Sequence, residues 1–399
     1  MVIKRREFLQ VGSLATASFM VPKFLKAFEK GQLVPPGNKV LVILQLSGGN
    51  DGLNTVIPVR NDIYYKVRPR LGIDKTKALL LNDEVGLHPA LTGLRDLYHN
   101  GNMGILNSVG YPNPDRSHFR SMDIWHSASR SDEYVNTGWV GRYLDAQCAG
   151  CDKPTQALEI DDTLSLALKG ENAKALAMRD PRRLYGTSQE KFFKEIVAGH
   201  KDEAGEQPVD YLYKTMAETV ASADYIFKQS KVHPSNAQYP NSTLGQSFKT
   251  IASLIMSDIN TKVYYVSLGS FDTHVNQSGQ QQRLFTEMND AITSFVSDLK
   301  SNNRFQDVML MSFSEFGRRV AQNASGGTDH GTANNMFLIS GGLKEKGMLN
   351  AMPDLADLQE GDLKHKVDFK QVYATILKNW LETDDLKILG RKFDYLSFL

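Results

Sequence analysis

Acidic and imidazole side chains stand near the ends of several apolar runs in this sequence. They are, with the run that each one borders, Asp51 (after 39–46), Asp272 and His274 (after 262–268), Glu315 (after 307–313), and Asp329 and His330 (before 335–340). If these runs are neighbouring parallel strands, four carboxylates and two imidazoles meet at one edge of a sheet. Such ligands suit zinc or manganese, and like charges this close together need a cation. The spacing therefore predicts a metal site for one or two ions.

Each of these residues also has a simpler explanation. Asp51, in a glycine-rich stretch, can shape a turn, and residues 272–274 can form an ordinary polar turn. Glu315 can cap a following helix with its carboxylate on the helix dipole. The pair Asp329 and His330 is the strongest single indication of a metal site. Packing alone gives little reason to place this pair in a Gly/Thr loop before a buried strand.

A candidate nucleophile is Ser117, between the apolar run 103–109 and the helix-like segment 122–127. At the start of a helix, backbone N–H groups and the dipole stabilise a developing anion. Serine also serves widely as an N-cap, so this is the competing explanation. Thr55, Ser121 and a metal-bound water remain alternative nucleophiles.

Basic side chains are candidates for protonating a leaving group and for holding charged oxygens. We expect His118 and Arg318 to act in catalysis, and Arg116 and Arg120 are further candidates. Side chains of this kind are more often surface or ion-pair residues.

Cys148 and Cys151 have the C-x-x-C spacing of redox proteins. The surrounding sequence lacks the thioredoxin-like pattern, which favours a local disulfide in an oxidising compartment over redox catalysis.

The elements that must position these residues alternate between strand and helix. Continuous apolar runs predict buried parallel strands at 39–46, 103–109, 262–268, 307–313 and 335–340. Helical stripes include Leu244, Phe248, Ile251 and Ile255; Leu284, Met288, Ala291, Phe295 and Leu299; and Val372, Tyr373, Ile376, Leu377 and Trp380. We therefore expect an α/β fold, with a mainly parallel central sheet and helices on both faces. Weaker periodicity predicts a polar insertion or cap at about 154–241.

The composition is that of an ordinary globular protein. The 399 residues include 46 Lys or Arg and 45 Asp or Glu, a formal charge of +1, and 41% are hydrophobic. This argues against disorder, collagen, a coiled coil and a multi-span membrane protein, and it gives no reason to expect nucleic-acid binding.

The first 30 residues resemble an export signal. The segment KRREFLQ at 4–10 precedes a modest apolar run at 11–21, which is too short for a stable membrane span. This predicts recognition by the twin-arginine translocation machinery and a periplasmic location. Because an A-x-A-like cleavage site is missing, the alternative is a basic amino-terminal helix of a cytoplasmic protein.

Taken together, the sequence blocks resemble an exported bacterial family, domain of unknown function 1501. The shared pieces are the twin-arginine start, LSGGNDGLNT at 46–55, GLHPAL at 86–91, SHF at 117–119, GWVGR at 138–142, FDTH at 271–274, SEFGRR at 314–319 and TDHGTAN at 328–334. That family is similar in turn to the alkaline phosphatase and sulfatase superfamily. The resemblance implies a single domain over 38–399 with a two-metal site. It implies the metal ligands Asp51, Asp272, His274, Glu315 and His330, with Ser117 at the nucleophile position.

These expectations combine into a metal-dependent periplasmic hydrolase of phosphate or sulfate esters, acting on a small-molecule or glycan ester. One alternative is a catalytically inactive protein on the same fold that binds a glycan or a protein partner. A C-x-x-C redox protein is a further alternative.

Overall fold

The computed structural model describes residues 39–147, 155–171, 175–199 and 208–399. The predicted export signal at 1–30 and the cysteines Cys148 and Cys151 lie outside the described residues.

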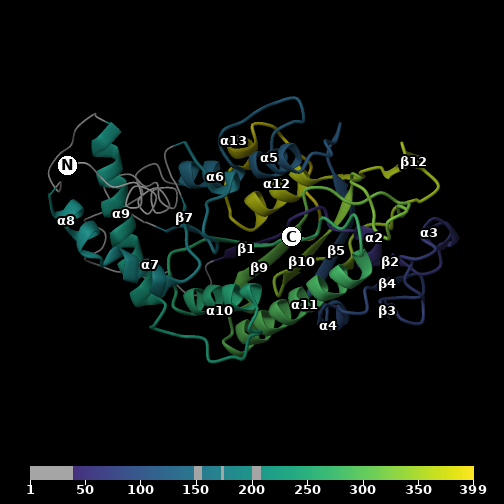
Figure 1. The fold of residues 1–399 in the computed structure, drawn as a ribbon, viewed down its shortest axis with the longest axis horizontal. Coiled ribbons are helices and arrows are strands. Elements are labelled where there is room, and N and C mark those ends of the chain that lie inside the picture. The colour runs from purple at the N-terminus through teal and green to yellow at the C-terminus, as the bar shows by residue number, and fades with distance from the viewer. Residues whose placement is uncertain (1–38, 148–154, 172–174, 200–207) are drawn as a thin grey trace.

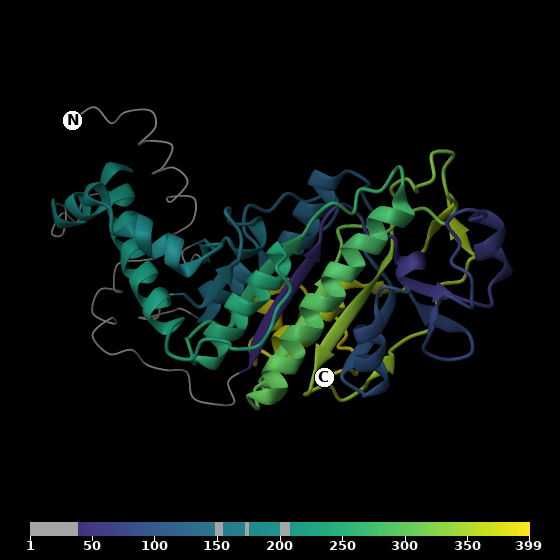
Figure 2. The same cartoon turned by 60° about the horizontal axis from the view of Figure 1, so that its bottom comes forward.

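The centre of the molecule is a nine-stranded sheet with the order β11-β5-β10-β9-β1-β8-β6-β7, in which β14 also pairs with β5 (Figures 1 and 2). Its strands are β1 (Val40–Leu46), β5 (Met103–Gly110), β6 (Ala157–Glu159), β7 (Leu176–Ala177), β8 (Val263–Leu268), β9 (Val308–Phe313), β10 (Asn334–Ser340), β11 (Gly347–Met348) and β14 (Val367–Asp368). The five predicted strands are confirmed as β1, β5, β8, β9 and β10. The prediction that all of them are parallel is wrong for β10, which is antiparallel to its neighbours, because a continuous apolar run indicates burial but not strand direction. The expected α/β fold with a mostly parallel sheet is therefore confirmed.

Strand direction explains how distant segments come together. Among the described strands of this sheet, β10 alone is antiparallel to its neighbours β5 and β9, whereas β1 runs parallel to β8 and β9. The start of β10 therefore lies at the same edge as the ends of β1, β8 and β9. This direction brings the loop that precedes β10 beside the loops that follow the parallel strands.

Side chains of the sheet alternate between two cores, as the pleat of a strand requires. In β1, Val42 and Leu44 belong to one core and Leu41 and Ile43 to the other. The first core is covered by α4 (Thr92–His99), α10 (Thr243–Met256) and α11 (Gln277–Ser301), and the second by α5 (His118–Ser127), α6 (Trp139–Gln147), α12 (Phe369–Asn379) and α13 (Asp385–Leu389) (Figure 1). The three predicted helical stripes lie on α10, α11 and α12, with Trp380 directly after α12.

The stretch predicted as an insertion differs from the expectation in one respect. Its first part supplies two strands of the main sheet, β6 and β7, which are too short to produce a recognisable apolar run. The helices α7 (Pro181–Ser188), α8 (Lys191–Gly199) and α9 (Pro208–Gln229) follow and lie at the end of the molecule opposite α2 (Gly52–Thr55) (Figure 1).

Short elements complete the described structure. They are α3 (Asp62–Val67), a small sheet of β2 (Val56–Pro58), β3 (Leu79–Leu80) and β4 (Val85–Leu87), the pair β12 (Leu358–Gln359) and β13 (Asp362–Leu363), and two short 3-10 helices, Leu166–Leu168 and Phe305–Asp307. Within the described part of the chain, no helix is both long enough and apolar enough to cross a membrane.

Candidate functional site

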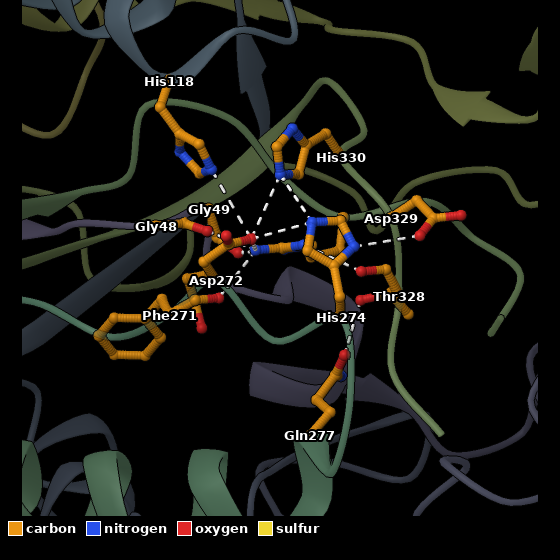
Figure 3. Close-up of polar contacts among 12 residues, drawn as sticks. Gly48, Gly49, His118, Phe271, Asp272, His274, Gln277, Thr328, Asp329 and His330 are labelled. Carbon is orange, nitrogen blue, oxygen red and sulfur yellow. Dashed lines mark hydrogen bonds and ion pairs between the residues drawn. The ribbon is translucent and has the colours of Figure 1, made fainter. Parts of the chain in front are cut away.

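Loops from four parts of the chain meet at the carboxyl-end edge of the parallel strands. Asp272 and His274 follow β8, Asp329 and His330 precede β10, and His118 begins α5 after β5. Figure 3 shows their side chains converging. The approach is close, because a Cβ atom on Gly48, after β1, would lie 2.4 Å from the backbone nitrogen of Asp272. Gly48 has a φ of +117°, a conformation that also favours glycine.

One carboxylate oxygen stands at the centre of the group. Asp272 Oδ1 lies 3.1 Å from His274 Nε2, 3.2 Å from His330 Nε2 and 3.6 Å from His118 Nε2. His274 Nε2 and His330 Nε2 are 3.0 Å apart. Ligand atoms of His118, Asp272 and His330 all lie within 4.8 Å of one another.

The other nitrogen of each ring contacts an acceptor. His118 Nδ1 lies 2.9 Å from Glu315 Oε1, His274 Nδ1 lies 3.1 Å from Asp329 Oδ1, and His330 Nδ1 lies 2.8 Å from the carbonyl oxygen of Arg116. With the proton on Nδ1, each neutral ring presents the Nε2 lone pair to the centre. Lone pairs and a carboxylate this close repel one another unless a cation or a proton lies between them.

The donor set fits a metal ion. Zinc bonds to nitrogen and oxygen of 2.0 to 2.2 Å, arranged tetrahedrally, place neighbouring ligand atoms about 3.3 to 3.6 Å apart. The distances around Asp272 Oδ1 are close to these values. His118 Nε2 is buried and has no hydrogen-bond partner in the described part of the chain, as expected for an atom that binds a ligand. His118, Asp272 and His330 can therefore hold a metal ion, and zinc or manganese suits them.

Glu315, predicted to be a ligand, lies behind His118. Its carboxylate is buried, and Oε1 accepts hydrogen bonds from the backbone nitrogen of Gly48 at 2.7 Å and from His118. Its hydrogen bond is the main reason that the pKa of His118 is raised above its usual value. Glu315 thus orients His118, in the way that carboxylates behind metal-bound imidazoles commonly orient a ring. The alternative prediction of a helix cap does not apply, because the described residues directly after Glu315 form no helix.

Arg318, predicted to act in catalysis, ties the loops together. Its buried guanidinium donates to the carbonyl oxygens of Gly48, Gly49, Phe271 and Thr328. It also donates to Asp272 Oδ1 at 2.7 Å. Burial opposes ionisation of Asp272, but the hydrogen bond from Arg318 and the contact with His330 outweigh it and lower the pKa of the carboxyl to about 2.

Asp51, predicted to be a ligand, stands outside the group of His118, Asp272 and His330. Its Oδ2 accepts from Arg68 at 2.5 Å and from Gln277 Nε2, and its Oδ1 accepts from the backbone nitrogen of Leu53 at 3.2 Å, where Asp51 caps α2. These contacts occupy the carboxylate within the protein. Arg68 and Gln277 were not predicted from the sequence, since neither stands in a motif or at a spacing that points to Asp51.

Ser117 differs from the other hydroxyl candidates in being exposed. It occupies the N-cap position of α5 without a side-chain capping hydrogen bond within the described chain. Thr55 and Ser121 are buried, and their hydroxyls donate to the carbonyl oxygens of Asp51 at 2.7 Å and Glu315 at 2.5 Å. Of the three hydroxyls, only that of Ser117 is accessible from solvent.

Comparison with known proteins places the chain in a family. Residues 100–391 match the family model described as "Protein of unknown function (DUF1501)". The chain belongs to the DUF1501 family. No curated protein sequence matches it.

Several solved structures are similar to this DUF1501 protein. The phosphonate monoester hydrolase SpPMH from Silicibacter pomeroyi is 7% identical with a TM-score of 0.42, over 89% of this chain and 74% of that chain. The PsFucS1 sulfatase from Pseudoalteromonas sp. is 11% identical with a TM-score of 0.37, over 97% and 72%. A protein in the alkaline phosphatase superfamily from Vibrio parahaemolyticus is 9% identical with a TM-score of 0.34, over 98% and 78%.

The family match of this DUF1501 protein includes His118, Asp272 and His330 and the three acceptors that orient the histidines. Asp51 and Arg68 precede the matched residues. The candidate metal group therefore lies entirely within the segment that the family model describes.

Proposed function

We propose that this DUF1501 protein hydrolyses phosphate or sulfate esters with a divalent ion held by His118, Asp272 and His330. The observation that supports this is the orientation of the rings: acceptors hold Nδ1 and direct Nε2 to one carboxylate oxygen. A site with three protein ligands leaves a coordination position open for a substrate. When bound, the ion would polarise the ester and offset its negative charge.

Ser117 is the proposed nucleophile. Its exposed hydroxyl lies at the start of α5, a ten-residue helix, where free backbone N–H groups favour negative charge. In the first step, Ser117 Oγ bonds to phosphorus or sulfur while the bond to the leaving alcohol's oxygen breaks. Water then releases the acid from Ser117 in a second step.

His274 and Asp329 are suited to moving the proton. Asp329 is kept ionised by hydrogen bonds from Asn323 and His274, which lower the pKa of its carboxyl. It holds His274 Nδ1, so that His274 Nε2 can take the proton of Ser117 and return it to the leaving oxygen. We assign this role to His274 in place of the ligand role predicted from sequence.

Arg116 is suited to binding the charged oxygens of the ester. Its side chain is 41% exposed, its guanidinium pairs with Asp362 and Glu360, and its carbonyl oxygen accepts from His330 Nδ1. Arg318 is less suited, because the protein itself occupies most of its donors. Arginine binds phosphate and sulfate oxygens in a fixed geometry that an ammonium group lacks.

The test is turnover of 4-nitrophenyl phosphate, 4-nitrophenyl sulfate and bis(4-nitrophenyl) phosphate by protein loaded with zinc or manganese. We expect turnover of at least one ester that chelation abolishes. His330→Ala should remove it, while His99→Ala, at an exposed histidine outside the site, should not. Ser117→Ala should lower kcat by at least 100-fold, and Ser301→Ala, at an exposed serine ending α11, should not change it.

Absence of turnover for all three esters with both metals would reject the proposal for these substrates. The alternative expectation, a non-catalytic protein that binds a glycan or a partner, would then take its place. Export by the twin-arginine route stays a prediction.

A further inference from the structure

A cavity of about 460 Å³ adjoins the candidate metal group, and Arg116 and Phe316 are among the residues that line it. The carbonyl oxygen of Arg116 lies 2.8 Å from His330 Nδ1. The centre of the Phe316 ring lies 4.6 Å from that of His330 and 4.9 Å from that of His118. Two residues of the cavity therefore pack directly against the proposed metal ligands. The volume is in the range of small-molecule binding sites.

Three polar side chains that line this cavity make no hydrogen bond within the described chain. They are Asn113, Gln359 and His365, and they come from the loop between β5 and α5, from β12, and from the loop between β13 and β14. Burial lowers the pKa of His365 below its usual value, so at pH 7 the neutral ring offers one donor and one acceptor. Each amide offers donors and an acceptor as well. Three separate segments thus present uncharged hydrogen-bonding groups to a ligand in the cavity.

The positive charges of the cavity are paired with acidic side chains. Arg116 pairs with Asp362 and Glu360, and Lys364, which also lines the cavity, pairs with Asp357. Among the described lining residues, no unpaired cation is therefore available to a charged alcohol. A large apolar alcohol would displace water from the three polar side chains without replacing its hydrogen bonds, which costs free energy. The lining consequently favours an occupant that is uncharged and carries several hydroxyl groups.

We infer that this cavity, here called the alcohol cavity, binds the alcohol portion of the ester and that this portion is an uncharged polyhydroxyl compound such as a sugar. This inference rests on the proposed function. Arg116 is the residue proposed to bind the charged oxygens of the ester, and it also lines the alcohol cavity. An ester held by Arg116 beside His118 and His330 therefore has the cavity next to its leaving oxygen. The hydroxyl groups of a sugar can bond to the free polar side chains, while its C–H groups contact the rings of Tyr111 and Phe316.

A kinetic experiment compares residues of the alcohol cavity with a matched position. His365→Ala and Gln359→Ala should each raise KM for the 6-phosphates or 6-sulfates of glucose and galactose by about 3- to 10-fold, the effect of one lost neutral hydrogen bond. The KM for ethyl phosphate or ethyl sulfate should not change. Gln359 is exposed, so its replacement should leave folding intact, and His99→Ala, at an exposed histidine on α4, should leave every KM unchanged. Equal changes for sugar and ethyl esters, or no change for sugar esters in either variant, would overturn the inference.

A binding experiment separates this inference from the proposed function. Methyl glucoside and methyl galactoside contain no phosphate or sulfate ester, so saturation-transfer NMR with them tests the alcohol cavity without turnover. We expect transfer from the natural protein and from His99→Ala, and its loss when His365→Ala and Gln359→Ala are combined. Transfer without turnover of any ester would support the cavity and reject the hydrolase. Turnover with neither transfer nor a selective change of KM would keep the hydrolase and reject this inference.

An apolar alcohol is the competing occupant. Transfer to phenol but to neither glycoside would show that the alcohol cavity prefers an apolar ring, and the inference of a polyhydroxyl substrate would fail.

Discussion

Asp51 and Asp272 occupy corresponding places in the fold but have different surroundings. They follow the neighbouring parallel strands β1 and β8, and each lies next to an arginine, at 2.5 Å for Arg68 and 2.7 Å for Arg318. The side chain of Asp51 is 1% exposed and that of Asp272 is 47% exposed. Contacts within the protein occupy the Asp51 carboxylate, whereas Asp272 Oδ1 faces three imidazole nitrogens and solvent. Asp51 is thus enclosed by the protein, whereas Asp272 stays open to a ligand.

Glu159, at the end of β6, shows what burial does to a carboxyl without a cation. Burial raises its pKa to about 8, although a hydrogen bond from the backbone nitrogen of Ser165, at 2.6 Å, opposes the rise. Glu159 therefore keeps its proton up to about pH 8. Asp272 differs, because the hydrogen bond from Arg318 lowers the pKa of its carboxyl.

Removal of the enclosed carboxylate should have the largest effect on stability. Asp51→Ala leaves the buried guanidinium of Arg68 without its charged partner, and we expect the free energy of unfolding to fall by about 3 to 5 kcal/mol in urea titrations. Asp96→Ala, which removes the carboxylate of the exposed Arg95–Asp96 pair, should cost less than about 1 kcal/mol. Equal losses in the two variants would show that Asp51 is not enclosed as described.

Glu159→Gln should change how stability depends on pH. The unfolded chain releases the Glu159 proton near the usual pKa of 4.5, and the folded chain keeps it to about 8. The unfolded state therefore binds fewer protons between these values, so the contribution of Glu159 to stability is full below pH 4.5 and declines as pH rises toward 8. Between pH 5 and 7.5 the decline is about 3 kcal/mol.

The measurement is urea unfolding of both proteins at pH 5 and at pH 7.5. The free energy of unfolding of the glutamine variant should lack this decline. Relative to that of the natural protein, it should therefore rise from pH 5 to pH 7.5. A constant difference between the two proteins would mean that Glu159 is already ionised at pH 5.

Sequence periodicity was sufficient to predict the main strands and helices. Strands that are buried on both faces appear as continuous apolar runs, and helices that are buried on one face appear as apolar stripes. Periodicity missed β6 and β7, since three and two residues carry no detectable period. The prediction that all five main strands are parallel was also wrong for β10, which is antiparallel to β5 and β9. The placement of Asp329 and His330 depends on the antiparallel course of β10, which pairing with β5 and β9 determines and periodicity does not.

For the site, the sequence identified the right segments but could not divide their residues by role. Asp51 and Asp272 both stand in polar loops after apolar strands. Only the folded chain shows that Arg68 and Gln277 enclose the first of them. The role of Glu315 likewise depends on its carboxylate pointing toward His118. The sequence around Glu315 does not specify that direction.

Glu315→Gln should weaken metal binding without removing a ligand. The amide keeps the approximate shape but loses the charge that holds His118 Nδ1, and changes of this kind commonly cost 10- to 100-fold in metal affinity. Competition with a chromogenic zinc chelator measures the affinity. Glu84→Gln, at an exposed carboxylate in the turn between β3 and β4, should leave it unchanged. An unaltered affinity in Glu315→Gln would show that this carboxylate does not orient a ligand.

Asp272→Asn should have the smallest effect on the stability of the metal-free protein. The side chain is half-exposed and the amide oxygen can still accept from Arg318, so we expect a change of less than about 1 kcal/mol. The effect should appear when zinc is added. At 100 times its dissociation constant, a ligand that binds only the folded state stabilises it by about 2.7 kcal/mol. We expect a gain of this size in the natural protein and none in Asp272→Asn at the same zinc concentration, measured by urea unfolding. Equal zinc stabilisation of both proteins would remove Asp272 from the metal group, and with it the distinction between the open and the enclosed carboxylate.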